Sequence, residues 1–251
     1  MLSKNQQKFI RSLHQKKFRQ EANAFLVEGE KNLVELLQSD WRQQLEALYC
    51  TAAFAQKYTS LLPDIYQIAS AEALEQAGSL TTNNQGLAVV ALPPKLPSLP
   101  DLEQASLVLA LHDLQDPGNL GTILRTADWY GIQWVFCSPQ TVDLYNPKVI
   151  SATKGAFLRV KVVYYDLEVV IKHCRQQQIP VYAAALGGRN LHTCTFGQRG
   201  GLVVVGNESA GLPSYLCQLA DHTIAIPKFG QAESLNVAVA AAVLLDNMRR
   251  S

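Results

Sequence analysis

Residues 116–131, DPGNLGTILRTADWYG, join a turn to a helix. The first four residues are typical of turns, and the small and apolar residues after them favour a helix. The apolar side of this helix follows the i, i+3, i+4, i+7 spacing and is predicted to face a sheet; it consists of Leu120, Ile123, Leu124 and Ala127. Arg125 lies off that side. We therefore expect Arg125 to point away from the core, either to pair with Asp128 at i+3 or to contact a ligand near the turn.

Outward from this helix, strand-like and helix-like segments alternate to the end of the chain. Several strand candidates are continuous apolar runs, as is typical of parallel strands buried on both faces. The predicted strands are residues 106–113, 132–137, 159–165, 179–186, 201–208 and 222–227, and the predicted helices are residues 119–130, 167–177, 213–219 and 234–249. This alternation predicts an α/β domain with a parallel sheet.

The preceding part of the chain alternates in shorter segments. Its predicted helices are residues 4–17, 30–37, 51–58 and 71–78, and its predicted strands are residues 24–29, 45–50, 64–69 and 86–92. A proline-rich stretch at 92–104, LPPKLPSLPDLEQ, is typical of a semi-rigid linker. We therefore predict a small α/β domain at residues 1–92, a linker at 93–104 and a second domain at 105–251.

Charge, cysteines and histidines exclude several classes of protein. With 22 basic and 21 acidic residues, the net charge of +1 gives no argument for nucleic acid. The five cysteines are odd in number and widely spaced, which fits a reducing compartment and argues against a disulfide frame or a zinc site. The five histidines have no partners at ligand spacing, so we expect no metal.

The longest apolar run, residues 237–245, is too short to span a bilayer, and no signal-peptide core is visible. We therefore expect a cytoplasmic protein.

A second polar corner follows the apolar run of residues 203–213, VVVGNESAGLP. The strand is predicted to end at Gly206, and Glu208 follows directly in the turn. A phosphate-binding P-loop would need a lysine where Leu212 stands, and no G-x-G-x-x-G occurs in the chain. The corner is either a glycine-rich turn with a surface carboxylate or part of a site that does not grip its ligand by phosphates.

A third corner lies in residues 224–245, IAIPKFGQAESLNVAVAAAVLL. A strand is predicted to end at Ile226, and a helix is predicted to begin near Ser234 as its N-cap. Asn236 either adds one capping bond or serves a ligand. Because ligands of open α/β sheets bind beyond the carboxyl ends of the strands, three polar corners on one edge predict a site there. No Ser-His-Asp set or G-x-S-x-G elbow is present, which argues against a serine hydrolase.

In order and spacing, the three stretches closely resemble the signature motifs of the SpoU-type branch of the SPOUT superfamily, which are S-adenosylmethionine-dependent RNA ribose 2′-O-methyltransferases. The first part, with FLVEG at 25–29 and NNQGLAVV at 83–90, is similar to that family's RNA substrate-binding domain, an α/β unit related to certain ribosomal proteins. The resemblance implies a C-terminal α/β domain with a deep trefoil knot, although knots are otherwise very rare.

The resemblance also implies roles for particular residues. The expected cofactor contacts, largely through backbone groups, are Gly206, Ile226 and Leu235. Asn119 is expected to shape the corner and to orient Arg125 or the ribose, and Glu208 to fix Arg125 or Asn236. Ser234 and Asn236 are expected to hold the nucleotide and the loop near the methyl group. The motif-one arginine is thought to activate the ribose hydroxyl, yet an arginine side chain keeps its proton and has no acceptor. Arg125 is thus either deprotonated in a desolvated pocket, or a charged clamp on the neighbouring phosphate that stabilises the developing alkoxide. The clamp is the interpretation that we favour.

The family resemblance further implies a homodimer that acts on RNA. The apolar helix around residues 235–245 is the expected dimer contact. A basic run before the first acid either tracks RNA phosphates or forms a solvated helix face; it comprises Lys4, Lys8, Arg11, Lys16, Lys17 and Arg19. Ribosomal RNA of the large subunit is the favoured substrate. A tRNA ribose methyltransferase and an RNA-binding protein with an inactive methyltransferase half are the alternatives.

Overall fold

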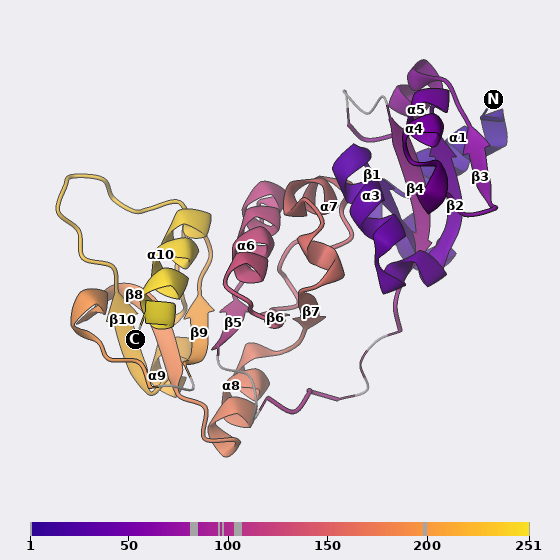
Figure 1. Cartoon of the computed structure of the whole chain (residues 1–251). Coiled ribbons are helices and arrows are strands. Elements are labelled where there is room, and N and C mark those ends of the chain that lie inside the picture. Colours follow the sequence, from indigo (N-terminus) through magenta and orange to yellow (C-terminus); the bar gives the residue numbers. More distant parts are fainter. Residues whose placement is uncertain are drawn as a thin grey trace. The chain divides into compact units, whose positions relative to one another are not determined.

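The computed structural model describes residues 2–80, 85–94, 96, 98–102, 107–197 and 200–250. Its contacts divide the chain into two compact units, which are described separately (Figure 1). The first unit comprises residues 1–95 and 143–158, and the second comprises residues 96–142 and 159–251. The predicted domain limits of 92/93 and 104/105 stay a prediction, and residues 83, 84, 95, 97, 103 and 104 of the predicted motif and linker lie outside the described residues.

The first unit is built on a mixed four-stranded sheet. Its strands, in spatial order, are β1 (Ala24–Glu28), β4 (Gly86–Ala91), β2 (Leu45–Cys50) and β3 (Tyr66–Ile68). β4 is antiparallel to both of its neighbours, and β2 is parallel to β3. The helices of this unit are α1 (Lys4–Ser12), α2 (Lys16–Ala22), α3 (Glu30–Gln38), α4 (Ala52–Lys57), α5 (Ala71–Ala77) and α7 (Pro147–Thr153). The sequence patterns did not predict α7, which packs against β1.

The prediction of a single helix over residues 4–17 is wrong, and buried Arg19 shows why. The guanidinium is only 3% exposed, and its Nη1 donates to the carbonyl oxygens of Leu13 at 2.8 Å and His14 at 3.0 Å. These bonds satisfy carbonyls just beyond the end of α1, while Nη2 pairs with the carboxylate of Asp143. Arg19 therefore serves the fold and is removed from the basic run expected to track RNA; the other five residues of that run are exposed.

The second unit contains a six-stranded sheet in which every pairing is parallel, as the apolar runs predicted. The strands, in spatial order, are β10 (His222–Ala225), β8 (Val181–Asn190), β9 (Gly201–Val205), β5 (Leu107–Leu111), β6 (Trp134–Cys137) and β7 (Lys161–Tyr164). The central strands β5 and β9 are buried along their whole length. Parallel strands place their carboxyl ends on one edge, and the three predicted corners follow β5, β9 and β10.

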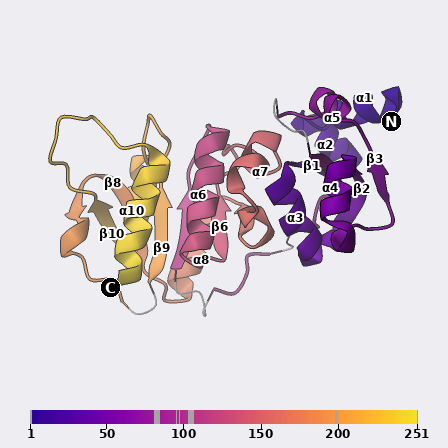
Figure 2. The same ribbon diagram turned by 45° about the horizontal axis from the view of Figure 1, so that its top comes forward.

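In the described part of this unit, the sheet is covered by the helices α6 (Pro117–Trp129), α8 (Leu167–Gln176), α9 (Ser214–Leu219) and α10 (Val237–Arg250). α8 and α9 contact each other and share a core cluster with the side chains of Val108, Ala110, Leu202 and Val204. α6 and α10 pack against each other (Figure 2). The helices that carry the first and third motifs are therefore neighbours. The trefoil knot stays a prediction.

Candidate active site

The first motif forms a capped helix with an exposed cation. Asp116 is the N-cap of α6, and its carboxylate accepts a hydrogen bond from the amide of Asn119 at 2.8 Å. The helix thus begins at Pro117, two residues earlier than predicted. The four residues of the apolar side are fully buried, as predicted, and Arg125 is exposed. Within the described residues, Arg125 has no hydrogen bond or ion pair, so the predicted alternative of a pair with Asp128 is wrong.

The second motif forms a tight loop after β9. The main chains of Asn207 and Gly211 exchange two hydrogen bonds, of 3.1 and 3.0 Å, and Gly211 has a φ of +67°. The side-chain oxygen of Asn207 accepts from the amides of Ser209 at 2.9 Å and Ala210 at 3.0 Å. Its Nδ2 donates to the carbonyl of Asp113 at 2.7 Å. The loop is therefore closed on itself and tied to the loop that follows β5.

This closure places Glu208 at the N-terminus of α6. Oε1 of Glu208 accepts a hydrogen bond of 3.1 Å from Nδ2 of Asn119. Two longer bonds, of 3.4 Å each, come from the main-chain amides of Gln115 and Asp116. A carboxylate is stabilised at this end of a helix because the unpaired amides carry partial positive charge. Glu208 contacts neither of its two expected partners, Arg125 and Asn236, directly.

The third motif joins this arrangement through Asn236. Its Nδ2 donates to Oδ1 of Asn119 at 3.0 Å, and its own Oδ1 accepts from the amide of Ala238 at 2.9 Å. Asn236 is thus the residue that caps α10, and the predictions that Ser234 is the N-cap and that the helix begins there are wrong. Ser234 is exposed, three residues before the helix. The chain of hydrogen bonds Glu208–Asn119–Asn236 connects all three motifs and fixes the orientation of both amides.

Two substitutions of Asn236 distinguish its capping of α10 from its hydrogen bond to Asn119. In Asn236→Asp an oxygen still caps α10, but no N–H remains for Asn119, so we expect unchanged thermal stability and an at least about tenfold slower rate of the methyl transfer that the family resemblance implies. Asn236→Ala also loses the cap and should destabilise the protein by about 0.5–2 kcal/mol. Thermal unfolding and methyl-transfer assays measure the two effects, with the unfolding temperature of Ser234→Ala as the unperturbed control. Full activity of the Asp variant would show that the connection to Asn119 has no role.

The segment between β10 and α10 has the groups that a phosphate-free cofactor needs. Within the described residues, the main chain of 226–235 makes no hydrogen bond, so its amides and carbonyls are available to a ligand. Apolar side chains accompany them: Ile226 is half-buried, Leu235 is 49% exposed and Phe229 is 92% exposed. Buried Gly206 closes the neighbouring loop. Free backbone groups beside apolar side chains fit the adenosine part of S-adenosylmethionine.

Other kinds of chemistry find little support in the described residues. They contain no group of three or more His, Cys, Asp or Glu side chains able to hold a metal ion. Burial raises the pKa of the Cys137 and Cys174 thiols, which keeps them protonated and poor nucleophiles. No described helix is long and apolar enough to cross a membrane.

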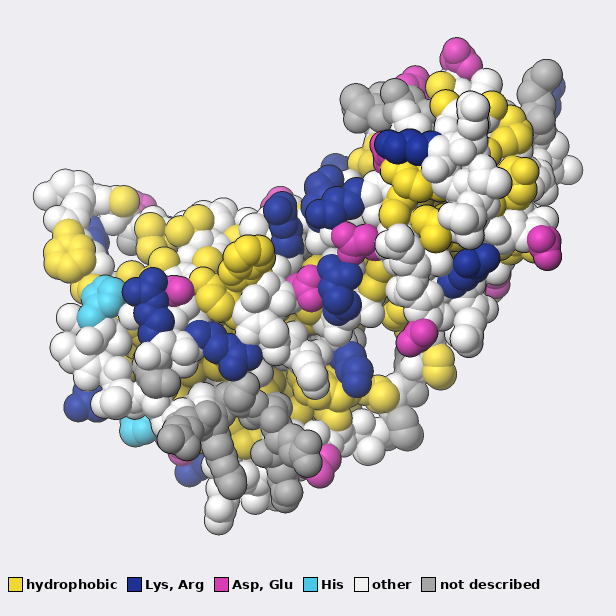
Figure 3. Space-filling model, in the orientation of Figure 1, with side chains coloured by type: hydrophobic (Ala, Val, Ile, Leu, Met, Phe, Trp, Pro, Cys, Tyr) yellow, Lys and Arg dark blue, Asp and Glu magenta, His cyan; other side chains and the backbone are white. Residues whose placement is uncertain are grey.

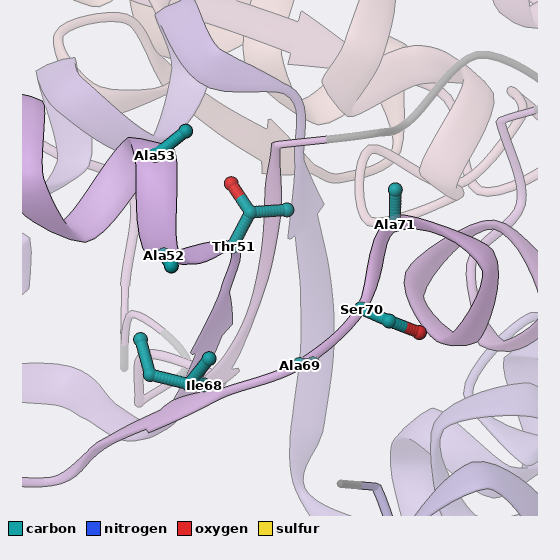
Figure 4. A pocket seen from close by; sticks show the side chains of 7 residues that line it. All are labelled: Thr51, Ala52, Ala53, Ile68, Ala69, Ser70 and Ala71. Carbon is teal, nitrogen blue, oxygen red and sulfur yellow. The ribbon is translucent and has the colours of Figure 1, made fainter.

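A hollow in the first unit contains none of the predicted site residues (Figure 4). It lies where β2 and β3 end, and it is lined by Thr51, Ala52, Ala53, Ile68, Ala69, Ser70 and Ala71. The two hydroxyl groups already accept hydrogen bonds from the helix amides of Phe54 at 3.2 Å and Ala73 at 3.3 Å. The remaining side chains are alkyl groups, so this hollow offers no side chain for catalysis.

Sequence reasoning missed three residues with contacts at or beside the candidate site: Asn207, Asp113 and Arg159. Asp113 adopts a φ of +53° directly after β5, a conformation that is uncommon outside glycine. Asn207 stood inside the quoted motif, and its tolerance of turn geometry was the signal that could have identified it. Nothing in the sequence indicates that Arg159 pairs with Asp128.

Comparisons with known proteins identify the family of both parts of the chain. Residues 106–246 match the SpoU rRNA Methylase family, and residues 4–89 match the MRM3-like substrate binding domain. The chain is 32% identical to the 23S rRNA (guanosine(2553)-2′-O)-methyltransferase RlmP of Bacillus subtilis, over 98% of this chain and 97% of that protein.

Two solved structures share the fold over the whole chain. A TrmH-family protein from Porphyromonas gingivalis superimposes with a TM-score of 0.86 at 34% identity and covers 100% of this chain and 99% of its own. An AdoMet-bound rRNA methyltransferase from Sinorhizobium meliloti also gives 0.86, at 26% identity, over 100% and 96% of the two chains. The three linked motifs, the parallel sheet and these matches show that the chain belongs to the SpoU rRNA methylase family.

Proposed function

We propose that this protein transfers a methyl group from S-adenosylmethionine to a ribose 2′-hydroxyl of large-subunit ribosomal RNA. The observation that carries the proposal is the Glu208–Asn119–Asn236 chain, which joins the three motifs on the sheet edge. Beside it, the guanidinium of Arg125 on α6 has no partner among the described residues. The full-length similarity to a 23S rRNA 2′-O-methyltransferase supports ribosomal RNA as the substrate class.

When bound, S-adenosylmethionine would supply a methyl group on a positively charged sulfonium sulfur. The backbone groups of Gly206, Ile226 and Leu235 would hold it. In this proposal Asn119 and Asn236 orient the ribose, because their amides are already fixed by hydrogen bonds. Holding the reacting groups in this orientation lowers the activation barrier of methyl transfer by several kcal/mol. The largest contribution known for such positioning is about 7–11 kcal/mol.

Arg125 would act as the charged clamp. Its planar fork of N–H donors matches a phosphate oxygen pair and stabilises negative charge that develops on the attacking ribose oxygen. The hydroxyl proton passes to phosphate or water, since a charged guanidinium has no acceptor for it. Ser234 is exposed beside Asn236 in the chain and would contact the nucleotide. On the face seen in Figure 3, lysine and arginine side chains lie among hydrophobic and acidic ones.

A direct comparison of RNA substrates tests this proposal. The protein is incubated with S-adenosylmethionine labelled in its methyl group and with either 23S rRNA or bulk tRNA, and the label is then mapped. We expect incorporation at one site of the rRNA. Label in tRNA alone would establish the tRNA alternative, and cofactor binding without methylation of any RNA would establish an inactive RNA-binding protein. We also expect the enzyme in the cytoplasm, where its five free cysteines would remain reduced.

We further propose that α6 and α10 form the contact of a homodimer. Trp129 on α6 is 85% exposed and Val239 on α10 is 50% exposed, and the two helices pack against each other, so both supply apolar surface that a partner could cover. Trp129→Glu should therefore convert the dimer to a monomer and lower methyl transfer at least about tenfold, because a buried charge costs several kcal/mol. Light scattering coupled to gel filtration measures the mass. Tyr215→Glu on α9, at a residue 49% exposed, is the matched control that should remain dimeric; a dimer that survives Trp129→Glu would place the interface elsewhere.

A further inference from the structure

Asp128 lies where its carboxylate could pair with Arg125 and occupy the N–H donors of that side chain. It follows Arg125 by three positions on α6, and oppositely charged side chains at this spacing are neighbours that attract each other by about 0.2–0.5 kcal/mol. A paired Arg125 would have fewer N–H donors and less net positive charge to offer a phosphate. The arginine is nevertheless unpaired within the described residues, so something else must engage the carboxylate.

Arg159 is that competing partner. Its Nε donates to both carboxylate oxygens of Asp128 at 3.0 Å each, and its Nη2 donates to Oδ2 at 2.8 Å. This two-pronged geometry is stronger and more directional than a single contact between flexible side chains. Arg159 lies two residues before β7, in the same unit as α6, so that unit contains both partners of the pair.

We infer that Arg159 is a positioning residue for methyl transfer, which keeps Asp128 away from Arg125 and neutralises its charge. The inference rests on the proposed function, in which Arg125 binds the phosphate beside the target ribose. Arg159 thereby favours RNA binding in two ways. The guanidinium of Arg125 stays available, and no unpaired carboxylate repels the RNA from the exposed side of α6.

Three variants test this inference through rescue. Arg159→Ala should lower kcat/KM for RNA about tenfold, because the released carboxylate of Asp128 captures Arg125, while the affinity for S-adenosylmethionine stays unchanged. Asp128→Asn alone should remain within about threefold of the wild type. The double variant Arg159→Ala/Asp128→Asn should recover to the level of Asp128→Asn, since no carboxylate is left to capture Arg125.

A readout independent of turnover is the salt dependence of RNA affinity. The logarithm of the RNA-binding constant falls linearly with the logarithm of the salt concentration, and each lost phosphate contact reduces the magnitude of this slope by about one. We expect that loss in Arg159→Ala and its reversal in the double variant. If the double variant stayed as weak as Arg159→Ala in either assay, Arg159 would act by contacting RNA or by supporting the fold, and the inference would be wrong.

Failure of the proposed function is distinguishable from failure of this inference. A wild-type protein that methylates neither rRNA nor tRNA would refute the proposed function before any variant is compared. The salt-dependence comparison would still decide whether Arg159 controls the availability of Arg125, because it measures binding alone.

Discussion

Replacing Arg125 with alanine should slow methyl transfer by about 10³-fold, while the affinity for S-adenosylmethionine stays within a few-fold of the wild type. Arg125 is exposed and unpaired within the described residues, so its removal costs little folding stability. In the proposed reaction, negative charge develops on the ribose oxygen only as the new bond forms. Losing a preorganised donor to such a charge typically costs about 10²–10³-fold in rate, and loss of the phosphate clamp adds to this.

Single-turnover methylation of RNA and calorimetry with the cofactor measure the two quantities separately. Arg125→Lys should retain part of the activity, because it keeps a charge but loses the two-pronged geometry. Arg175→Ala is the matched control and should be fully active, because Arg175 lies on α8 in an exposed ion pair with Asp221. Full activity of Arg125→Ala would contradict the assigned role.

Gly206→Ala should weaken the binding of S-adenosylmethionine by about 10²-fold and destabilise the protein by about 1–3 kcal/mol. A Cβ atom at this position would lie 2.2 Å from the carbonyl carbon of Gly211 and 2.4 Å from the amide nitrogen of Leu212. Both atoms belong to the backbone and cannot move aside without opening the loop. Opening it would break the bonds between Asn207 and Gly211 and displace Glu208 from the N-terminus of α6.

Calorimetry and thermal unfolding check this prediction against a glycine outside the three motifs. A Cβ atom on Gly197 would meet nothing within 4 Å, so Gly197→Ala should leave stability unchanged and the cofactor affinity within about twofold. Wild-type affinity in Gly206→Ala would show that the closed loop after β9 is not part of the cofactor site.

The features that the sequence predicted correctly depend on local repetition. The apolar run from Gly201 to Val205 indicated a strand buried on both faces, and the spacing of Leu120, Ile123 and Leu124 indicated the buried side of α6. Each signal lies within a few residues and needs no partner elsewhere in the chain. For the same reason the three polar corners could be predicted to follow strands whose carboxyl ends lie on one edge of the sheet.

The features that it missed depend on partners far along the chain. Ser234 and Asn236 are both good capping residues, and the choice of Asn236 coincides with its contact to Asn119, 117 positions away. Arg19 looked like one more surface cation until Asp143 provided a buried partner 124 positions away. Asp128 likewise pairs with Arg159, and not with Arg125, its neighbour on α6. A local sequence pattern cannot show which of two equally suitable side chains the fold brings into contact with a residue.

The chemical position of the transferred methyl group tests the central claim most directly. RNA that has reacted with the protein and methyl-labelled S-adenosylmethionine is hydrolysed in alkali, which cleaves next to every free ribose 2′-hydroxyl. A methylated 2′-oxygen blocks that cleavage, so we predict that the label is recovered in an alkali-resistant dinucleotide. Label recovered in single nucleotides, and therefore on a base, would contradict the account.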